Sequence, residues 1–95
     1  MENNIYISSL YDIYGELLTE IQKKYFEDYY FNNYSLSEIS ENYNVTRNAV
    51  HKSIKEAEKN LNNFEEKLGY AKKIKRIKEL NIDKRIKEQI IDIFE

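Results

Sequence analysis

Residues 35–50, "SLSEISENYNVTRNAV", predict a short helix, a tight turn and the start of a second helix. Ser35 and Glu38 form a capping-box pattern, in which each side chain accepts a hydrogen bond from the backbone N–H of the other residue. Asn44 suits the left-handed conformation of a tight turn, and Thr46 is a typical N-cap. The stretch therefore predicts a helix-turn-helix, a unit that often places its second helix in the major groove of DNA.

The second helix of this unit has a polar outer face opposite Val50, Ile54 and Ala57. Arg and Lys side chains bind guanine edges or phosphates, and Asn pairs with adenine. A helix N-terminus also attracts phosphate. We expect the helix-turn-helix to cover about residues 35–60 and its DNA contacts to be made by Arg47, Asn48, His51, Lys52 and Lys55.

Two features oppose the DNA interpretation. Glu56 and Glu58 follow closely and are expected to repel a phosphate backbone. The same polar residues are also typical of the solvent face of an amphipathic helix.

The helix after the turn is predicted to be long. Apolar residues recur along it at alternating steps of four and three, which is typical of a seam against another helix. That helix belongs either to the same chain or to a second copy, and the spacing is compatible with both. The seam consists of Val50, Ile54, Ala57, Leu61, Phe64, Leu68 and Ala71.

Two further helices are predicted before residue 35. Residues 7–18 carry apolar side chains at steps of three and four, and Thr19 with Gln22 repeats the capping-box pattern. Eight of the nine tyrosines lie within residues 1–43, which suggests either stacking on single-stranded RNA or an aromatic core. Their neighbours are acidic, which favours the core, with the hydroxyl groups reaching water.

The end of the chain is basic. Residues 69–95 carry eight bases and five acids, whereas residues 1–34 carry two bases and six acids. The bases of "KKIKRIK", residues 72–78, are candidates for secondary phosphate contacts, with a solvated helix face and a membrane-surface helix as alternatives. These candidates are Lys72, Lys73, Lys75 and Arg76.

A last helix is predicted to start at Asn81 or Asp83. The long helix that precedes this last helix either ends at Gly69 or continues through it. The apolar stripe of the last helix consists of Ile82, Ile86, Ile90 and Ile93.

Composition indicates an all-α protein. The 95-residue chain has no proline, two glycines and many Lys, Glu, Leu and Ile residues. We expect a small helical bundle with a helix-turn-helix and a long following helix. It forms one domain over residues 1–95, with a basic tail over residues 70–95.

Enzyme, cofactor and metal signatures are missing from the sequence. Cysteine is absent, His51 alone cannot form a zinc site, and there is no glycine-rich phosphate loop. Carboxylate pairs such as Glu65 and Glu66 are typical of a charged helix surface. No apolar run approaches the ~20 residues of a membrane span, and no signal peptide is visible, so we expect a cytoplasmic protein without a cofactor.

Three pieces of the sequence carry a family resemblance. In chain order they are "LLTEIQKKYFEDYYF", "SLSEISENYNVTRNAV" and "FEEKL", all within residues 10–68. Together they resemble the YlxM-like family of small bacterial helix-turn-helix proteins. The middle piece also resembles the last DNA-binding region of bacterial sigma factors, region 4.

The resemblance implies an all-helical, sigma region 4-like fold and a homodimer whose second motif helix starts at Arg47 and contacts DNA. The family is described as associated with the bacterial signal recognition particle, because its genes lie beside the gene for the particle's GTPase. Gly69 and Tyr70 depart from the apolar residues expected there, and the tail after residue 70 matches only in general character.

Two functions are compatible with these observations. The first is a DNA-binding regulator. The second is an adaptor that docks on the GTPase or the RNA of the signal recognition particle, using an acidic first half and a basic tail.

Overall fold

The computed structural model describes residues 4–94, and every regular element in that range is helical. Residues 1–3 and 95, the ends of the predicted domain, lie outside the described range. The fold class predicted from the sequence is therefore confirmed. The elements are α1 (Asn4–Tyr14), the 3₁₀ turn η1 (Gly15–Leu17), α2 (Glu20–Tyr30), α3 (Leu36–Tyr43), α4 (Arg47–Leu68), α5 (Tyr70–Lys78) and α6 (Lys84–Asp92).

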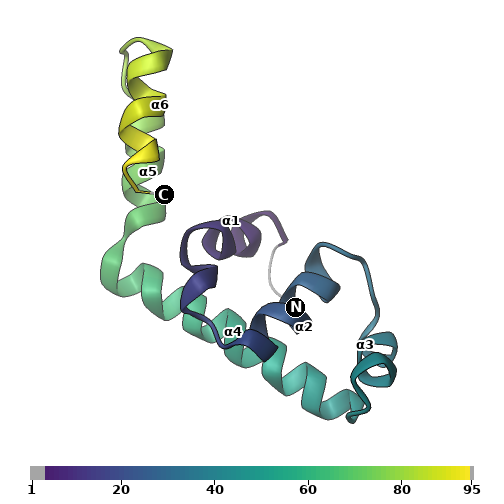
Figure 1. The fold of residues 1–95 in the computed structure, drawn as a ribbon. Helices are drawn as coiled ribbons and strands as arrows, with labels where there is room; N and C mark the ends of the chain where they lie inside the picture. The colour runs from purple at the N-terminus through teal and green to yellow at the C-terminus, as the bar shows by residue number, and fades with distance from the viewer. Residues whose placement is uncertain (1–3, 95) are drawn as a thin grey trace.

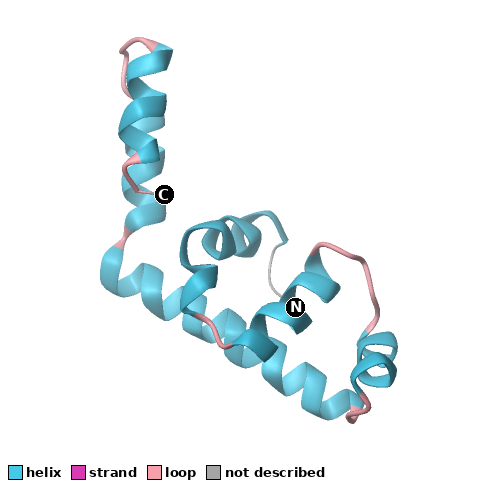
Figure 2. Ribbon diagram, in the orientation of Figure 1, coloured by secondary structure: helices cyan, strands magenta, loops and turns pink. Residues whose placement is uncertain are grey.

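The long helix α4 organises the molecule. Helices α1, α2 and α3 pack along it, and α5 and α6 form an antiparallel hairpin that projects from its C-terminal end (Figure 1). This hairpin gives the molecule an elongated shape of 50 × 24 × 21 Å. Short loops join the helices, and residues 4–94 contain no strand (Figure 2).

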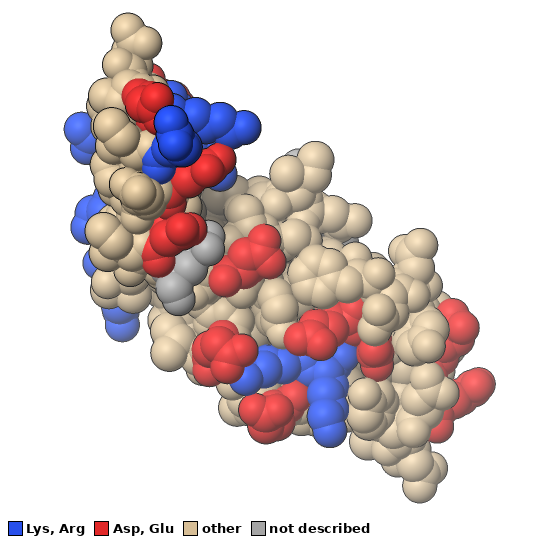
Figure 3. Space-filling model, turned by 45° about the horizontal axis from the view of Figure 1, so that its top comes forward, with Lys and Arg blue, Asp and Glu red and all other residues tan. Residues whose placement is uncertain are grey.

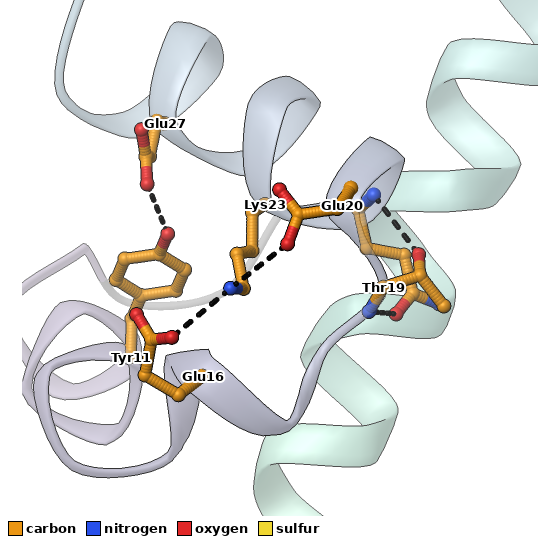
Figure 4. A network of polar contacts seen from close by, with 7 residues as sticks. Tyr11, Glu16, Thr19, Glu20, Lys23 and Glu27 are labelled. Carbon is orange, nitrogen blue, oxygen red and sulfur yellow. Dashed lines mark hydrogen bonds and ion pairs between the residues drawn. The ribbon is translucent and has the colours of Figure 1, made fainter.

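The start of α2 is held by the predicted capping box. The Gln22 backbone N–H donates to Thr19 Oγ1 at 3.2 Å, and the Thr19 N–H donates to Gln22 Oε1 at 3.1 Å. Beside it, Lys23 Nζ lies 3.2 Å from a Glu16 oxygen and 3.3 Å from a Glu20 oxygen (Figure 4). These hydrogen bonds raise the pKa of Lys23 and tie the η1 turn to α2.

The predicted seam of α4 is buried within its own chain. Val50 and Ile54 pack with residues of α2 and α3, whereas Ala57 and Leu61 pack with residues of α1 and α2. All four side chains are fully buried. Of the remaining seam residues, Phe64 and Ala71 are partly buried against the same core, whereas Leu68 is 40% exposed. The intramolecular alternative is therefore the correct one for the four fully buried positions.

The tyrosines of the first half belong mainly to the core. Tyr14 and Tyr25 are buried, and the Tyr11 ring stacks on Phe26 with 4.6 Å between ring centroids. The hydroxyl groups of several tyrosines donate to carboxylates. The donor and acceptor pairs are Tyr11–Glu27, Tyr14–Glu65, Tyr30–Glu58 and Tyr43–Asp28.

Candidate nucleic-acid interface

Local hydrogen bonds build the helix-turn-helix as the sequence predicts. The Glu38 backbone N–H donates to Ser35 Oγ and the Ser35 N–H donates to Glu38 Oε1, both at 3.0 Å. The Ser35 backbone hydrogen bond lowers the pKa of Glu38. Asn44 ends α3 in the left-handed conformation, with φ 54°, and Thr46 Oγ1 caps α4 by accepting from the Ala49 N–H at 3.1 Å.

An apolar cluster fixes the angle between α3 and α4. Ile39 of α3 packs with Val50 and Ile54 of α4, and all three are fully buried. Tyr25 and Leu36 complete the cluster. Val45, in the turn between the two helices, is 39% exposed. The first turns of α4 are thus held rigidly by one face, which leaves the opposite face open.

That open face carries the predicted nucleic-acid contacts. All five side chains are exposed, and the residues recur at steps of four, as expected for neighbours on one side of a helix. The first turn of α4 contains no acidic residue, so the positive end of its helix dipole is not neutralised there. The five residues are Arg47, Asn48, His51, Lys52 and Lys55.

One of the two acids expected to repel DNA is turned away from this face. Glu58 is only 2% exposed, and its Oε1 accepts a hydrogen bond from the Tyr30 hydroxyl at 3.2 Å. Glu56 is exposed, as expected. Of these two acids, only Glu56 therefore lies where it could repel a phosphate backbone.

The bases of α5 form a separate surface. Lys72, Lys73, Lys75 and Arg76 are exposed, but α5 follows the C-terminal end of α4, whereas the helix-turn-helix contains its N-terminal end (Figure 1). Lys72 and Lys75 line a groove of about 520 Å³ between α1 and α5, opposite Asp12. The structure thus places the two predicted groups of contacts at opposite ends of one helix.

The surface charge also differs between the α5–α6 hairpin and the rest of the molecule. In the view of Figure 3, Lys and Arg side chains gather over the α5–α6 hairpin, while acids predominate over the other helices of the face shown.

Glu65 is a structural residue that the sequence does not reveal. It is 7% exposed, and its carboxylate accepts hydrogen bonds from the Tyr14 hydroxyl at 2.7 Å and from the backbone N–H groups of Ala71 at 2.9 Å and Lys72 at 3.3 Å. The Tyr14 hydroxyl also accepts from the Tyr70 N–H at 3.0 Å. Burial and the Glu65 hydrogen bond raise the pKa of Tyr14 to about 12.

These bonds satisfy the first three N–H groups of α5 with side chains from α1 and α4. Glu65 was expected on a solvated surface, and nothing in the sequence pattern distinguishes it from the exposed Glu66 beside it. Its role is to fix the hairpin on the body of the protein.

A metal site and a membrane-spanning helix each place requirements on the described part of the chain. Within residues 4–94, no three His, Cys, Asp or Glu side chains gather in a way that would hold a metal ion. None of the helices described is both long and apolar enough to cross a bilayer.

Comparison with known proteins assigns the chain to a family. Residues 1–93 match the model of the UPF0122 family, described as "Putative helix-turn-helix protein, YlxM / p13 like". The chain belongs to this family. The resemblance seen in the sequence is therefore confirmed, including the helix-turn-helix character of the family.

Several UPF0122 proteins are similar to this chain. A relative from Desulforamulus reducens is 55% identical over 67 residues, which cover 70% of this chain and 57% of the relative. One from Malacoplasma penetrans is 49% identical over 86 residues, covering 90% and 75%, and one from Listeria monocytogenes is 50% identical over 64 residues, covering 67% and 58%. The match thus spans less than two thirds of some of these relatives.

Proposed function

We propose that this protein is a DNA-binding regulator that reads the major groove with the first turns of α4. The observation that carries the proposal is the division of α4 into two faces. Val50 and Ile54 anchor the helix, while five polar and basic side chains from Arg47 to Lys55 are exposed to solvent at a helix end whose first turn carries no acid. A protein with this role acts in the cytoplasm of a bacterium, where the chromosome lies.

The test is a comparison of two matched variants. Fragments of the source genome are selected on the purified chain, and the affinity of the enriched site is measured for wild type and for the Arg47→Ala, Lys52→Ala double variant. Each base-edge contact contributes about 1–3 kcal/mol, so we expect at least a tenfold loss of affinity. Lys67→Ala removes an exposed base from the last turn of α4 and is expected to have little effect.

One result of this comparison would contradict the proposal. If the double variant retains the affinity and the sequence preference of the wild type, the outer face of α4 does not read DNA. Circular dichroism of both variants checks that the helices are intact.

An adaptor role on the signal recognition particle is the second candidate. The separation of the α5 bases from the helix-turn-helix supports it, because two distant surfaces suit two different partners. Salt separates the candidates: contacts to phosphates weaken steeply as salt rises, whereas an apolar protein interface does not. Binding of the purified particle GTPase that persists after nuclease treatment and at high salt would favour the adaptor.

A further inference from the structure

The groove between α1 and the α5–α6 hairpin is lined with apolar side chains. Its volume of about 520 Å³ lies within the range of protein sites that hold a ligand or a few side chains of a partner. Ile74 of α5 is buried, and the other apolar residues of the lining are half-buried. These apolar residues are Ile13, Ala71, Ile74 and Ile91.

The two sides of the groove are fixed relative to each other. The Tyr14 hydroxyl of α1 accepts from the Tyr70 N–H, and Glu65 of α4 accepts from the N–H groups of Ala71 and Lys72. The groove is therefore formed before a partner arrives, which lowers the entropic cost of binding. The same bonds occupy the N–H groups at the start of α5, so an anion in the groove has to be held by side chains.

Such side chains line the groove from α5. Lys72, Lys75 and Lys78 recur at steps of three, and all three are exposed. They span about 9 Å along the helix axis. None of them forms an ion pair with an acid of residues 4–94. From the other side, α1 contributes the exposed Asp12. The groove thus has a basic edge, an apolar lining and one acid on the opposite edge.

The other two bases predicted to contact phosphates lie elsewhere on α5. Lys73 and Arg76 line a separate hollow together with Ile77, Leu80 and Phe94. A nucleic-acid strand in the groove would therefore meet only some of the bases of α5. It would also be repelled by Asp12 and would leave the apolar lining unused.

We propose that this groove binds an amphipathic helix of a partner protein. The apolar stripe of that helix contacts Ile74 and Ile91, and acidic residues at steps of three or four pair with the lysines of α5. A base or a hydroxyl on the opposite edge of the partner helix faces Asp12, which sets its orientation. A bilayer fits less well, because a flat surface does not enter a concave groove. The proposal does not depend on DNA binding, which is assigned to the other end of α4.

Selection of peptides provides the test. A phage library of helical peptides of about 14 residues is selected on the purified full chain. We expect the enriched peptides to carry Leu, Ile or Phe at steps of three and four, flanked on one edge by Glu or Asp. One of them is then synthesised, and its affinity is measured by isothermal titration calorimetry.

Charge reversal locates the binding site of this peptide. The Lys72→Glu, Lys75→Glu double variant is expected to bind it at least about tenfold more weakly, because like charges then face each other. The matched control is Lys73→Glu, Arg76→Glu, which makes the same change of charge on the same helix outside the groove. We expect this control to stay within about twofold of the wild type.

A reversed peptide provides the folding control. When its acids are replaced by lysines, we expect it to bind the Lys72→Glu, Lys75→Glu variant and to lose affinity for the wild type. The Arg47→Ala, Lys52→Ala variant should bind the original peptide like the wild type. A failure of DNA binding is thereby separated from a failure of the groove.

Several outcomes would overturn the proposal. One is a selection that enriches no helix, or only helices without acids. Another is a peptide that responds equally to the two double variants, because it then binds another surface or only the net charge. If no helix binds, but the Lys72→Glu, Lys75→Glu variant alone loses binding of a short RNA or of oleate, the groove takes a nucleic acid or a fatty acid instead.

Discussion

Glu65 holds the first turn of α5, although it lies on a different helix. A helix N-terminus usually receives its cap from the residue that directly precedes the helix, but Gly69 has no side chain to provide one. The carboxylate of Glu65 and the hydroxyl of Tyr14 take over this role from α4 and α1. The direction of the hairpin therefore depends on two buried side chains far apart in the sequence.

Removal of the Tyr14 hydroxyl is expected to destabilise this junction. Tyr14→Phe keeps the buried ring but leaves the Tyr70 N–H without its acceptor, at a cost of about 1–3 kcal/mol in the free energy of unfolding. Urea denaturation measures the loss, and hydrogen exchange should quicken at the start of α5. The control is Tyr34→Phe, an exposed position at which we expect a change within about 0.5 kcal/mol. Equal effects at both positions would show that the Tyr14 hydroxyl does not hold the hairpin.

The buried carboxylate of Glu58 is expected to lower the free energy of unfolding. It is 2% exposed, and its Oε2 has no hydrogen-bond partner within residues 4–94. Burial of an incompletely satisfied carboxylate is costly, so Glu58→Met should stabilise the protein by about 1 kcal/mol or more. Glu56→Met, two residues earlier on the exposed face, is the matched control and should change little. Destabilisation by Glu58→Met in thermal denaturation would mean that its bond to Tyr30 outweighs the cost of burial.

At the scale of elements, Gly69 separates α4 from α5. Its φ is +66°, a left-handed conformation that glycine adopts without strain and other residues rarely adopt. The change of direction at this residue turns α5 away from the axis of α4 (Figure 1). An uninterrupted helix would carry Tyr70 and Ala71 past the end of α1 and break the contacts to Glu65.

Substitution at Gly69 tests this turn. A Cβ would meet no atom within 4 Å, so any cost of Gly69→Ala comes from the backbone conformation and not from a clash. We expect Gly69→Ala to lower the free energy of unfolding by about 1 kcal/mol and Gly69→Asn to lower it less, because Asn tolerates the left-handed conformation. If alanine instead stabilises the protein, α4 and α5 have merged into one helix, which small-angle scattering would detect as a longer particle.

At the scale of the whole molecule, tyrosine–carboxylate pairs link the helices to one another. Burial and the bond to Glu65 raise the pKa of Tyr14 to about 12, and burial and the bond to Glu27 raise that of Tyr11 further. Burial raises the pKa of Tyr43 as well, with Asp28 adding to the effect. These pairs join α1 to α2, α1 to α4, and α3 to α2.

Stability should therefore fall in alkaline solution. The unfolded chain releases its tyrosine protons near pH 10, whereas the folded chain keeps them, so the stabilisation is complete below pH 10 and is lost as the pH rises toward 12. The contribution of Tyr14 alone should fall by about 1.4 kcal/mol per pH unit in this range. Urea denaturation at a series of pH values measures the slope, and Tyr14→Phe should flatten it. An unchanged slope in that variant would contradict the assignment.

Much of the fold follows from local sequence. The capping boxes at Thr19 and Ser35, the left-handed Asn44 and the Thr46 cap involve residues within four positions of each other, so the predicted helix starts are confirmed. The all-α class follows from composition, and the exposure of the five candidate contact residues on α4 follows from periodicity.

The tertiary structure decided which apolar and charged faces are buried. Periodicity shows that α4 has a seam, but only packing shows that α1, α2 and α3 of the same chain cover it, while three of the four isoleucines in the predicted stripe of the last helix, Ile82, Ile86 and Ile93, stay exposed. Likewise, Glu58 and Glu65 look like surface acids until tyrosines 28 and 51 residues away come into contact with them. Helix starts depend on neighbours within one turn, which the sequence displays directly. Burial depends on which distant segment closes over a face, and that is settled only when the whole chain packs.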